Sequence, residues 1–236
     1  MRNRSRTLVV ILFGPPGSGK STQAALAERS FGLAHISPGD MLRTHMAAGS
    51  ALGSRVAAVM RAGGLAPDEI INGMIADRIA EPDCANGFVL DGYPRTRNQT
   101  QVLINVLQQR NCDPVVIRLT LDPKVAAARL FGRQECRVCG ALYHRVTRPP
   151  KAAGICDSDG SELTVRVDDS EDAIRARLSV YEAETEPARK LLSDAGYACK
   201  SVSNDAQPPE VTASEIAEWL RGTRMRERRP ASPAIL

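Results

Sequence analysis

One stretch near the N-terminus restricts the fold more than any other. The apolar run TLVVILF at 7–13 is followed directly by GPPGSGKS at 14–21. The run is rich in β-branched residues, which is typical of a strand buried on both faces of a parallel sheet. The second stretch fits the pattern G-x-x-x-x-G-K-[ST], and a helical pattern follows it. Because the motif has a strand before it and a helix after it, the sequence predicts a phosphate-binding loop.

Each residue type in this loop has an expected role. Gly17 and Gly19 let the backbone curl, so that several N–H groups converge on one anion. Lys20 is expected to reach the outer phosphates, and Ser21 or Thr22 can hold magnesium. The N-terminal end of the following helix adds partial positive charge at the same point.

An acidic residue stands at the end of a second apolar stretch, VLDGYPR at 89–95. Taken alone, Asp91 followed by glycine is most simply a strand-ending turn. Beside a phosphate loop, an aspartate in this position orients water on magnesium rather than taking a proton. The upstream loop therefore favours the metal role for Asp91.

The rest of the chain alternates between strand and helix patterns. Further strands are expected at 87–92, 114–122 and 197–203, and helices at 67–81, 96–110, 123–131, 169–194 and 209–221. This alternation predicts an α/β fold of the phosphate-loop NTPase type, in which helices flank a parallel sheet. Residues 37–66 have helical spacing and no strand, and 133–168 are rich in cysteine, proline and glycine. Both segments are expected to be excursions from the sheet.

Composition excludes several classes of function. The 236 residues carry a formal net charge of only +4, which suits small anionic ligands better than bulk nucleic-acid binding. No stretch approaches the ~18–20 apolar residues that a membrane span needs. Residues 1–6 are basic without an apolar signal sequence, and 222–236 form a basic, then Pro/Ala-rich tail expected to be disordered. A cytoplasmic protein is expected.

Two short cysteine patterns share one frame inside the 133–168 segment. Cys136 and Cys139 form C-x-x-C-G, and Cys156 and Asp159 form C-x-x-D-G. Asp159 therefore occupies a fourth ligand position, and its oxygen is an acceptable zinc ligand. A knot held by hydrogen bonds without metal, and reduced thiols without a ligand, remain alternatives. His144 could replace Asp159, although it lies outside the shared frame.

Four protein ligands leave no open position for catalysis, so such a zinc would be structural. It would make a small segment rigid that buries little core of its own. The other three cysteines, Cys84, Cys112 and Cys199, stand in or near apolar stretches and are expected to be packing residues.

Several motifs occur in one order along the chain: GPPGSGKSTQ, HISPGDMLR, DGYPRT, CRVCGALYH and RVDDSEDAIRARLSVYEAET. From about residue 7 to about 221, they resemble the adenylate kinase family, in its bacterial form with a long lid. The resemblance implies reversible phosphoryl transfer from Mg-ATP to AMP, a structural zinc ion and a monomer. It also implies a core of 7–36, 67–132 and 169–221, an AMP-binding segment at 37–66, and at 133–168 a lid that closes over ATP.

The same resemblance implies roles residue by residue. ATP would be contacted by Gly17, Ser18, Gly19, Lys20, Ser21, Thr22, Arg129, Arg133, Leu142, Tyr143 and either Ala206 or Gln207. AMP would be contacted by Pro38, Arg43, Gly64, Leu65, Ala66, Gly92, Tyr93, Pro94, Arg95, Gln99, Arg166 and Arg177. The catalytic set would be Lys20, Asp91, Arg95, Arg133, Arg166 and Arg177. Arg43 and Arg95 would hold the AMP phosphate, since planar guanidinium groups suit the charge that spreads during phosphoryl transfer. Gln99 would recognise the adenine of AMP.

The chain departs from the family pattern at two positions near AMP. Pro38 stands where the family usually has threonine, which removes a hydroxyl and an N–H and affects affinity or selectivity for the base. Tyr93 stands where phenylalanine is usual. Three other functions compete with an AMP kinase: a UMP/CMP-type kinase, which usually has a short lid without cysteine pairs, a zinc-ribbon nucleic-acid-binding module, and a slowly hydrolysing nucleotide switch.

Overall fold

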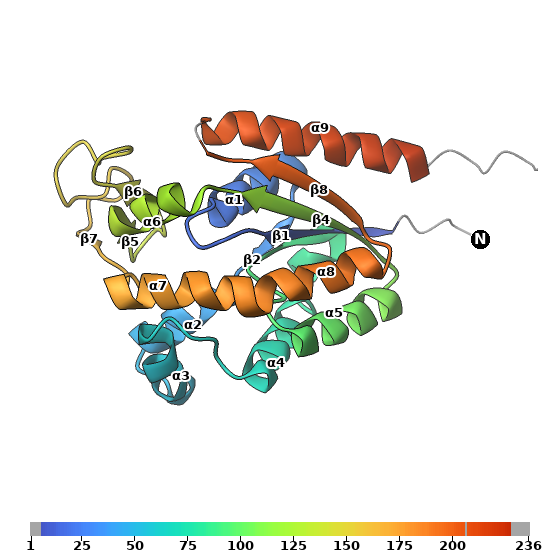
Figure 1. The fold of residues 1–236 in the computed structure, drawn as a ribbon, viewed down its shortest axis with the longest axis horizontal. Coiled ribbons are helices and arrows are strands. Elements are labelled where there is room, and N and C mark those ends of the chain that lie inside the picture. Colours follow the sequence, from blue (N-terminus) through green and yellow to red (C-terminus); the bar gives the residue numbers. More distant parts are fainter. Residues whose placement is uncertain (1–5, 206, 228–236) are drawn as a thin grey trace, which may run out of the picture.

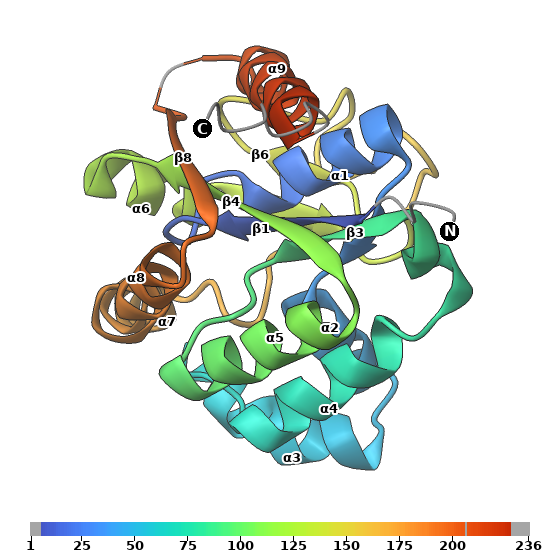
Figure 2. The same ribbon diagram turned by 90° about the vertical axis from the view of Figure 1, so that its right-hand side faces the viewer.

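The computed structural model describes residues 6–205 and 207–227 and shows a five-stranded parallel sheet with helices on both faces (Figures 1 and 2). The strands lie in the order β2-β3-β1-β4-β8. Their bounds are β1 (Thr7–Phe13), β2 (Ala34–Ile36), β3 (Gly87–Asp91), β4 (Cys112–Thr120) and β8 (Ala198–Ser203). Every neighbouring pair is parallel, as the alternation of strand and helix patterns predicts.

The central strand β1 explains how the two helical layers are held. Its side chains alternate between the faces of the sheet, as they must in an extended chain. Leu8, Val10 and Leu12 pack in one core, while Val9, Ile11 and Phe13 pack in the other. All six are buried, which accounts for the uninterrupted apolar run in the sequence.

Different helices cover the two faces. On the face of Leu8, the helices are α1 (Lys20–Phe31) and α9 (Pro209–Glu227). The opposite core contains residues of α2 (Pro38–Ala47), α3 (Ala51–Arg61), α4 (Asp68–Arg78), α5 (Arg97–Gln109), α8 (Glu186–Asp194) and the short 3-10 helix η1 (Pro82–Asn86). In the described residues no helix combines the length and the apolar character that a membrane span requires.

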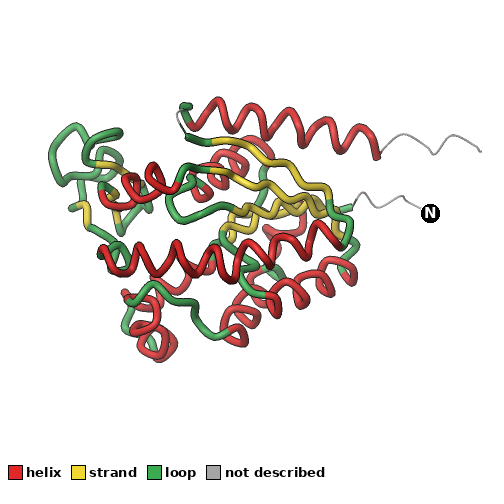
Figure 3. The backbone as a smooth tube through the Cα atoms, in the orientation of Figure 1, coloured by secondary structure: helices red, strands yellow, loops and turns green. Residues whose placement is uncertain are grey.

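A second, smaller sheet lies beyond the end of the main sheet that carries the phosphate loop (Figure 3). Helix α6 (Pro123–Phe131) leads from β4 into it, and its strands pair in the order β6-β5-β7. These strands are β5 (Arg133–Cys136), β6 (Leu142–His144) and β7 (Leu163–Thr164), all antiparallel. Its buried core is small: Cys136, Tyr143, Cys156 and Leu163.

The chain returns from the small sheet through one long, interrupted helix. It consists of α7 (Glu171–Val180), a π-helical turn η2 (Tyr181–Thr185) and α8. A continuous helix over 169–194 was expected from the sequence. Pro187 has no N–H to donate, and the wider π turn directly before it accommodates its ring within the helix.

Three further expectations differ from the structure. Strand β2 was not predicted, because three residues are too few for a periodicity to show. Helix α9 continues to Glu227, so the disorder expected for 222–236 is wrong for 222–227, and 228–236 lie outside the described residues. Cys199 is exposed on the edge strand β8 and is not a packing residue, whereas Cys84 and Cys112 are buried as expected.

Candidate active site

The phosphate-loop residues follow β1 and curl at the start of α1. Gly17 and Gly19 have φ values of 83° and 87°, a region that side chains with a Cβ rarely adopt. A Cβ on Gly17 would lie 2.8 Å from the carbonyl oxygen of Ala126. Gly19 is the N-cap of α1 and brings no side chain to the first-turn N–H groups. No side chain of the N-cap residue therefore competes with an anion for these donors.

Lys20 lies at the mouth of this loop. Its ammonium group donates to the carbonyl oxygens of Gly14 at 2.8 Å and Pro15 at 3.0 Å. Burial, with smaller contributions from Arg95 and Arg177, lowers the pKa of Lys20 to about 7, although the carboxylate of Asp91 acts in the opposite direction. A bound phosphate would restore a counter-charge to this group.

Asp91 ends β3, the strand beside β1, and its side chain is buried. Its Oδ2 lies 3.4 Å from Nε2 of His35 on the neighbouring strand β2. Burial raises the pKa of Asp91, but the hydrogen bond with His35 and the charge of Lys20 outweigh it and hold the pKa below its usual value. An ionised carboxylate beside Ser21 and the phosphate loop is a donor set that suits Mg²⁺. The role of His35 was not predicted, because its strand was not.

Five of the arginines that line one cavity of about 950 Å³ come from four separate stretches and face a common space. They are Arg43 on α2, Arg95 after β3, Arg133 and Arg166 in the segment of the small sheet, and Arg177 on α7. The volume is at the upper end of the ~300–1,000 Å³ usual for small-molecule sites. All five were predicted to bind phosphate groups, and the fold brings all five to the same space.

Two buried carboxylates that were not predicted to be site residues hold three of these arginines. Asp169 accepts from Nε and Nη2 of Arg133 at 2.8 and 2.6 Å, and from Nη1 of Arg177 at 2.7 Å. Asp168 lies 3.8 Å from Nη1 of Arg43 and 3.4 Å from Nη1 of Arg177. The sequence signal was the pair of adjacent aspartates before α7, which could equally have served as helix caps.

Arg95 has a different environment. Its Nε donates to the carbonyl oxygen of Gly92 at 2.7 Å. Burial and then the charge of Arg177 lower the pKa of Arg95 to about 10. A buried guanidinium with this surplus of positive charge favours an anionic ligand.

The other predicted nucleotide contacts divide into lining and supporting positions. Most line the cavity: Gly17, Gly19, Ser21, Thr22, Pro38, Gly64, Leu65, Ala66, Gly92, Pro94, Gln99, Arg129, Leu142 and Tyr143. Ser18 and Tyr93 are buried and are not among its lining residues. The Tyr93 hydroxyl donates to Oδ1 of Asn72 at 2.8 Å, so this ring supports the wall from behind.

Arg129 and Asn204 connect the loop after β8 with the phosphate loop. Arg129 Nη2 donates to the carbonyl oxygens of Asn204 and Asp205 at 2.8 and 3.0 Å. Asn204 Nδ2 in turn donates to the carbonyl oxygen of Ser18 at 2.8 Å. Gln207 lines the cavity, whereas Ala206, the other candidate for the adenine contact, lies outside the described residues.

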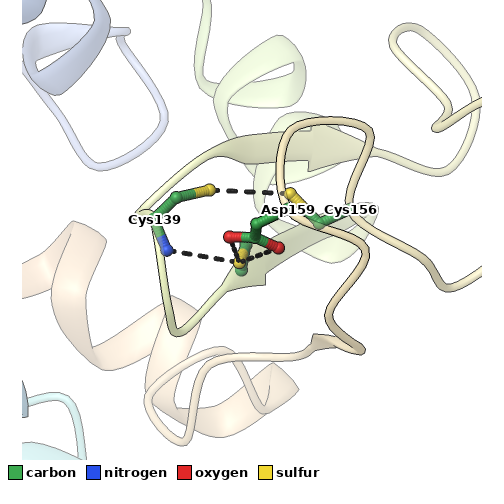
Figure 4. Close-up of side chains that lie close together, drawn as sticks. Cys139, Cys156 and Asp159 are labelled. Atoms are coloured by element: carbon green, nitrogen blue, oxygen red, sulfur yellow. Dashed lines mark hydrogen bonds between the residues drawn. The ribbon is translucent and has the colours of Figure 1, made fainter.

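The cysteine patterns meet at one point of the small sheet. Ligand atoms of Cys136, Cys139, Cys156 and Asp159 all lie within 4.8 Å of one another. Figure 4 shows Cys139, Cys156 and Asp159 turned towards a common centre. The Cys139 and Cys156 sulfurs are 3.5 Å apart, and the Cys136 sulfur lies 3.2 Å from Oδ2 of Asp159. A tetrahedral zinc site with ordinary bond lengths has ligands ~3.3–3.8 Å apart, so this donor set fits the ion.

The surrounding backbone also fits a metal–thiolate centre. N–H groups of Val138 and Cys139 donate to the Cys136 sulfur, each at 3.4 Å, and that of Ser158 donates to the Cys156 sulfur at 3.4 Å. Such donors stabilise thiolate charge. His144 is not part of the cluster: its Nδ1 accepts from the N–H groups of Val146 and Thr147, both at 3.1 Å.

Comparison with known proteins adds an independent finding. A family model for adenylate kinase matches residues 12–196. An adenylate kinase of Symbiobacterium thermophilum is 41% identical over 216 residues, which are 91% of this chain and 99% of the relative. One of Trichlorobacter lovleyi is 48% identical over 192 residues, or 80% and 89% of the two chains. One of Anaeromyxobacter sp. (strain Fw109-5) is 43% identical over 190 residues, with the same coverage.

Proposed function

The chain belongs to the adenylate kinase family of phosphotransferases, and we propose that its central cavity carries out reversible phosphoryl transfer from Mg-ATP to AMP, giving two ADP. The observation that carries the proposal is the convergence of the glycine loop, Lys20 and five arginines on one cavity. Phosphoryl transfer needs little covalent participation from a protein. It needs two aligned nucleotides and positive charge around the moving phosphorus.

The phosphate loop is proposed to hold ATP. The first-turn N–H groups of α1 and Lys20 would bind its β- and γ-phosphates, and Asp91 with Ser21 or Thr22 would hold Mg²⁺ through oxygen. When bound, Mg²⁺ neutralises charge on the phosphates. Arg129 and the backbone near Gln207 would border the adenine of ATP.

Arg43 and Arg95 are proposed to hold the AMP phosphate across the cavity from the loop. Arg43 is hydrogen-bonded to Asp40 and lies near Asp168, so a phosphate would compete with these carboxylates for the guanidinium. Arg133, Arg166 and Arg177 would then surround the transferred group. Gln99 would recognise the adenine of AMP, beside Pro38 and residues 64–66.

The segment 133–168 is proposed to be a lid made rigid by structural zinc, and 37–66 the AMP-binding segment. Four protein ligands would complete a zinc site, so the ion would take no part in the reaction. Closure of the lid would exclude water that otherwise hydrolyses ATP and would bring Arg133 and Arg166 to the phosphates. A monomer suffices, because one chain supplies both nucleotide sites.

The decisive test is ADP formation from Mg-ATP with each nucleoside monophosphate in turn. We expect AMP to be the preferred acceptor. Preference for UMP or CMP would instead support the related kinase class. Lys20→Ala and Arg95→Ala should each lose about 3–4 kcal/mol of transition-state stabilisation, as expected for a removed electrostatic contact. Normal turnover by either variant would contradict the assignment.

A further inference from the structure

Gln99 is held by two groups of opposite hydrogen-bonding character. The backbone N–H of Arg95 donates to its Oε1 at 2.8 Å, and its Nε2 donates to Oδ1 of Asp68 at 2.7 Å. The other oxygen of Asp68 accepts from the Thr96 hydroxyl at 2.7 Å, and Thr96 Oγ1 accepts from the N–H of Gln99 at 3.1 Å. These contacts join the first turn of α4 to the first turn of α5.

Asp68 lies behind Gln99 as seen from the cavity. Gln99 is buried and lines the cavity together with Gly64, Leu65 and Pro38. Asp68 is not among the described residues that line it. A hydrogen-bonded influence of Asp68 on a bound nucleotide would therefore act through the carboxamide of Gln99.

The two contacts determine which way round the carboxamide lies. A backbone N–H can only donate, and a carboxylate can only accept. Turning the amide by 180° would place N–H against N–H at Arg95 and oxygen against oxygen at Asp68. A carboxamide has two N–H groups and two acceptor positions, and one of each is already used here. One donor and one acceptor remain, in fixed positions.

A fixed donor and acceptor can distinguish purines by polarity. The ring edge of a 6-amino purine offers a donor at the 6-position and an acceptor at N1, and a 6-oxo purine offers the reverse. An amide free to turn could satisfy either edge. We infer that Asp68, acting with the N–H of Arg95, fixes the polarity of Gln99 and makes the cavity select 6-amino over 6-oxo purine nucleotides. This inference rests on the proposed function, in which Gln99 faces the AMP base.

Asp68 is thus a positioning residue that determines specificity, and removing its acceptor should relax the selection. In Asp68→Ala or Asp68→Ser, water or a hydroxyl replaces the carboxylate, and either can donate or accept. Only the Arg95 N–H then opposes a turn of the amide. We expect the ratio of kcat/KM for AMP to that for IMP to fall about tenfold or more, since one misplaced buried hydrogen bond has roughly that effect. IMP is the matched competitor because it lacks the 2-amino group of GMP.

The isosteric Asp68→Asn is the control. Its carbonyl can accept from Gln99 Nε2 while its amide donates to Thr96 Oγ1, so the Gln99 orientation is kept. We expect the AMP/IMP ratio to stay within about threefold of that of the unmodified chain. In Asp68→Ala and Asp68→Ser, the fall in kcat/KM for AMP should come mainly from a higher KM rather than from a lower kcat, because Asp68 does not touch the transferred phosphate.

The outcomes separate this inference from the function on which it rests. If the AMP/IMP ratio is unchanged in both Asp68→Ala and Asp68→Ser, the inference is wrong. The inference is equally wrong if the AMP/IMP ratio falls as far in Asp68→Asn as in Asp68→Ala. The charge of Asp68, rather than the direction of its acceptor, would then determine the selection. Gln99→Ala tests recognition itself: loss of discrimination there, without loss in the Asp68 variants, rejects only the role of Asp68. No turnover of AMP by the unmodified chain would reject both. Should Asp68→Ala fail to fold, Asp68→Ser decides, because serine tolerates the first turn of a helix.

Discussion

At the scale of single residues, Lys20 shows how the site is prepared for an anion. It shares the cavity with the five arginines predicted to bind phosphate, and burial lowers its pKa to about 7. ATP would bind more tightly when the Lys20 amine is protonated, so binding would raise the pKa of Lys20. From about pH 7 upward, binding therefore takes up a proton, and affinity must fall as the pH rises through this window.

We predict that ATP binds the unmodified chain progressively more weakly above pH 7, by up to about tenfold for each pH unit. Lys20→Met should bind ATP more weakly at pH 6.5 and show a flatter profile. Titration calorimetry in two buffers of different ionisation enthalpy measures the proton uptake directly. Ionisation of ATP itself is common to both proteins and cancels. Equal slopes for the two proteins would exclude Lys20 as the group that titrates.

The residues of the site differ in how far sequence alone could place them. The phosphate loop and Asp91 follow from motif and context, because local backbone geometry determines them. The arginines were assigned through family resemblance, since an isolated arginine on a helix is ordinarily a solvated side chain. Asp169, which holds Arg133 and Arg177, could not be assigned, because its partners arrive from distant stretches.

At the scale of elements, the small sheet should depend on its metal centre. Its buried core contains only four residues, two of them cysteines that are predicted zinc ligands. We predict one zinc ion per chain and a fall of several degrees in Tm on chelation, since metal binding contributes directly to the stability of such small units. Asp159→Ala should lose zinc more readily and have a lower Tm.

Asp159→Cys is the matched control for this prediction. It would complete a set of four thiolates, which zinc accepts equally well, so metal content and Tm should be retained. Zinc analysis after a chelator challenge and calorimetry give the two readouts. If Asp159→Ala abolished turnover but left zinc content and melting unchanged, the proposed structural role of the metal would be wrong.

The π turn between α7 and α8 is fastened by a charged network centred on Glu186. Its Oε1 lies 3.1 Å from Nη2 of Arg118 on β4 and accepts from Nε of Arg189 at 2.9 Å, and its Oε2 accepts from the Tyr181 hydroxyl at 3.0 Å. Burial and the charge of Glu186 raise the pKa of Tyr181 to about 12. The network therefore ties the interrupted helix to the main sheet.

Glu186→Ala should lower the free energy of unfolding by about 1–2 kcal/mol, because two guanidinium groups lose their shared acceptor. For a chain of this size that is a fall of ~2–8 °C in Tm. The exposed Glu182→Ala, one turn earlier, removes the same charge and should change Tm little. The Tyr181 pKa, followed by ultraviolet absorbance, should also move down towards its ordinary value. Equal Tm values for Glu186→Ala and Glu182→Ala would contradict the proposal that Glu186 ties the interrupted helix to the main sheet.

The elements were largely predictable where a pattern had room to repeat. Strands β1, β3, β4 and β8 and the helices between them follow from apolar runs and helical spacing of ordinary length. Strand β2 has three residues and, among the described strands, pairs with β3 alone, so its formation depends on tertiary contact. The π turn had a signal in Pro187, yet a proline alone does not say whether a helix ends, bends or widens.

At the scale of the whole molecule, two distant segments meet across the mouth of the cavity. Asp40 on α2 is hydrogen-bonded to Arg43 and lies 3.7 Å from Nη2 of Arg166, which comes from 133–168. Burial raises the pKa of Asp40, but the charges of Arg43 and Arg166 outweigh it and lower the pKa to about 2. The contact thus connects the proposed lid, 133–168, with the proposed AMP-binding segment, 37–66.

We predict that Asp40→Asn shifts the free protein towards a more open arrangement by about 1 kcal/mol, or about fivefold in population, as for a partly exposed ion pair. The radius of gyration from small-angle scattering should rise relative to that of the unmodified chain. Asp77→Asn, an exposed position on α4 with the same charge change, should leave it unchanged.

Three conditions make this test specific to the ion pair. Because the folded pKa of Asp40 is lowered, its contribution is present above pH 4 and is lost only as the pH falls through about 2. The difference in radius of gyration between the unmodified chain and Asp40→Asn should therefore be constant from pH 5 to pH 8. About 1 M salt should open the unmodified chain and hardly affect Asp40→Asn, since screening removes what the mutation has already removed. A saturating bisubstrate mimic should give both proteins one radius, because its phosphates replace Asp40 as the partner of Arg43. Equal radii in the free state, at low salt, would mean that this contact does not hold the two segments together.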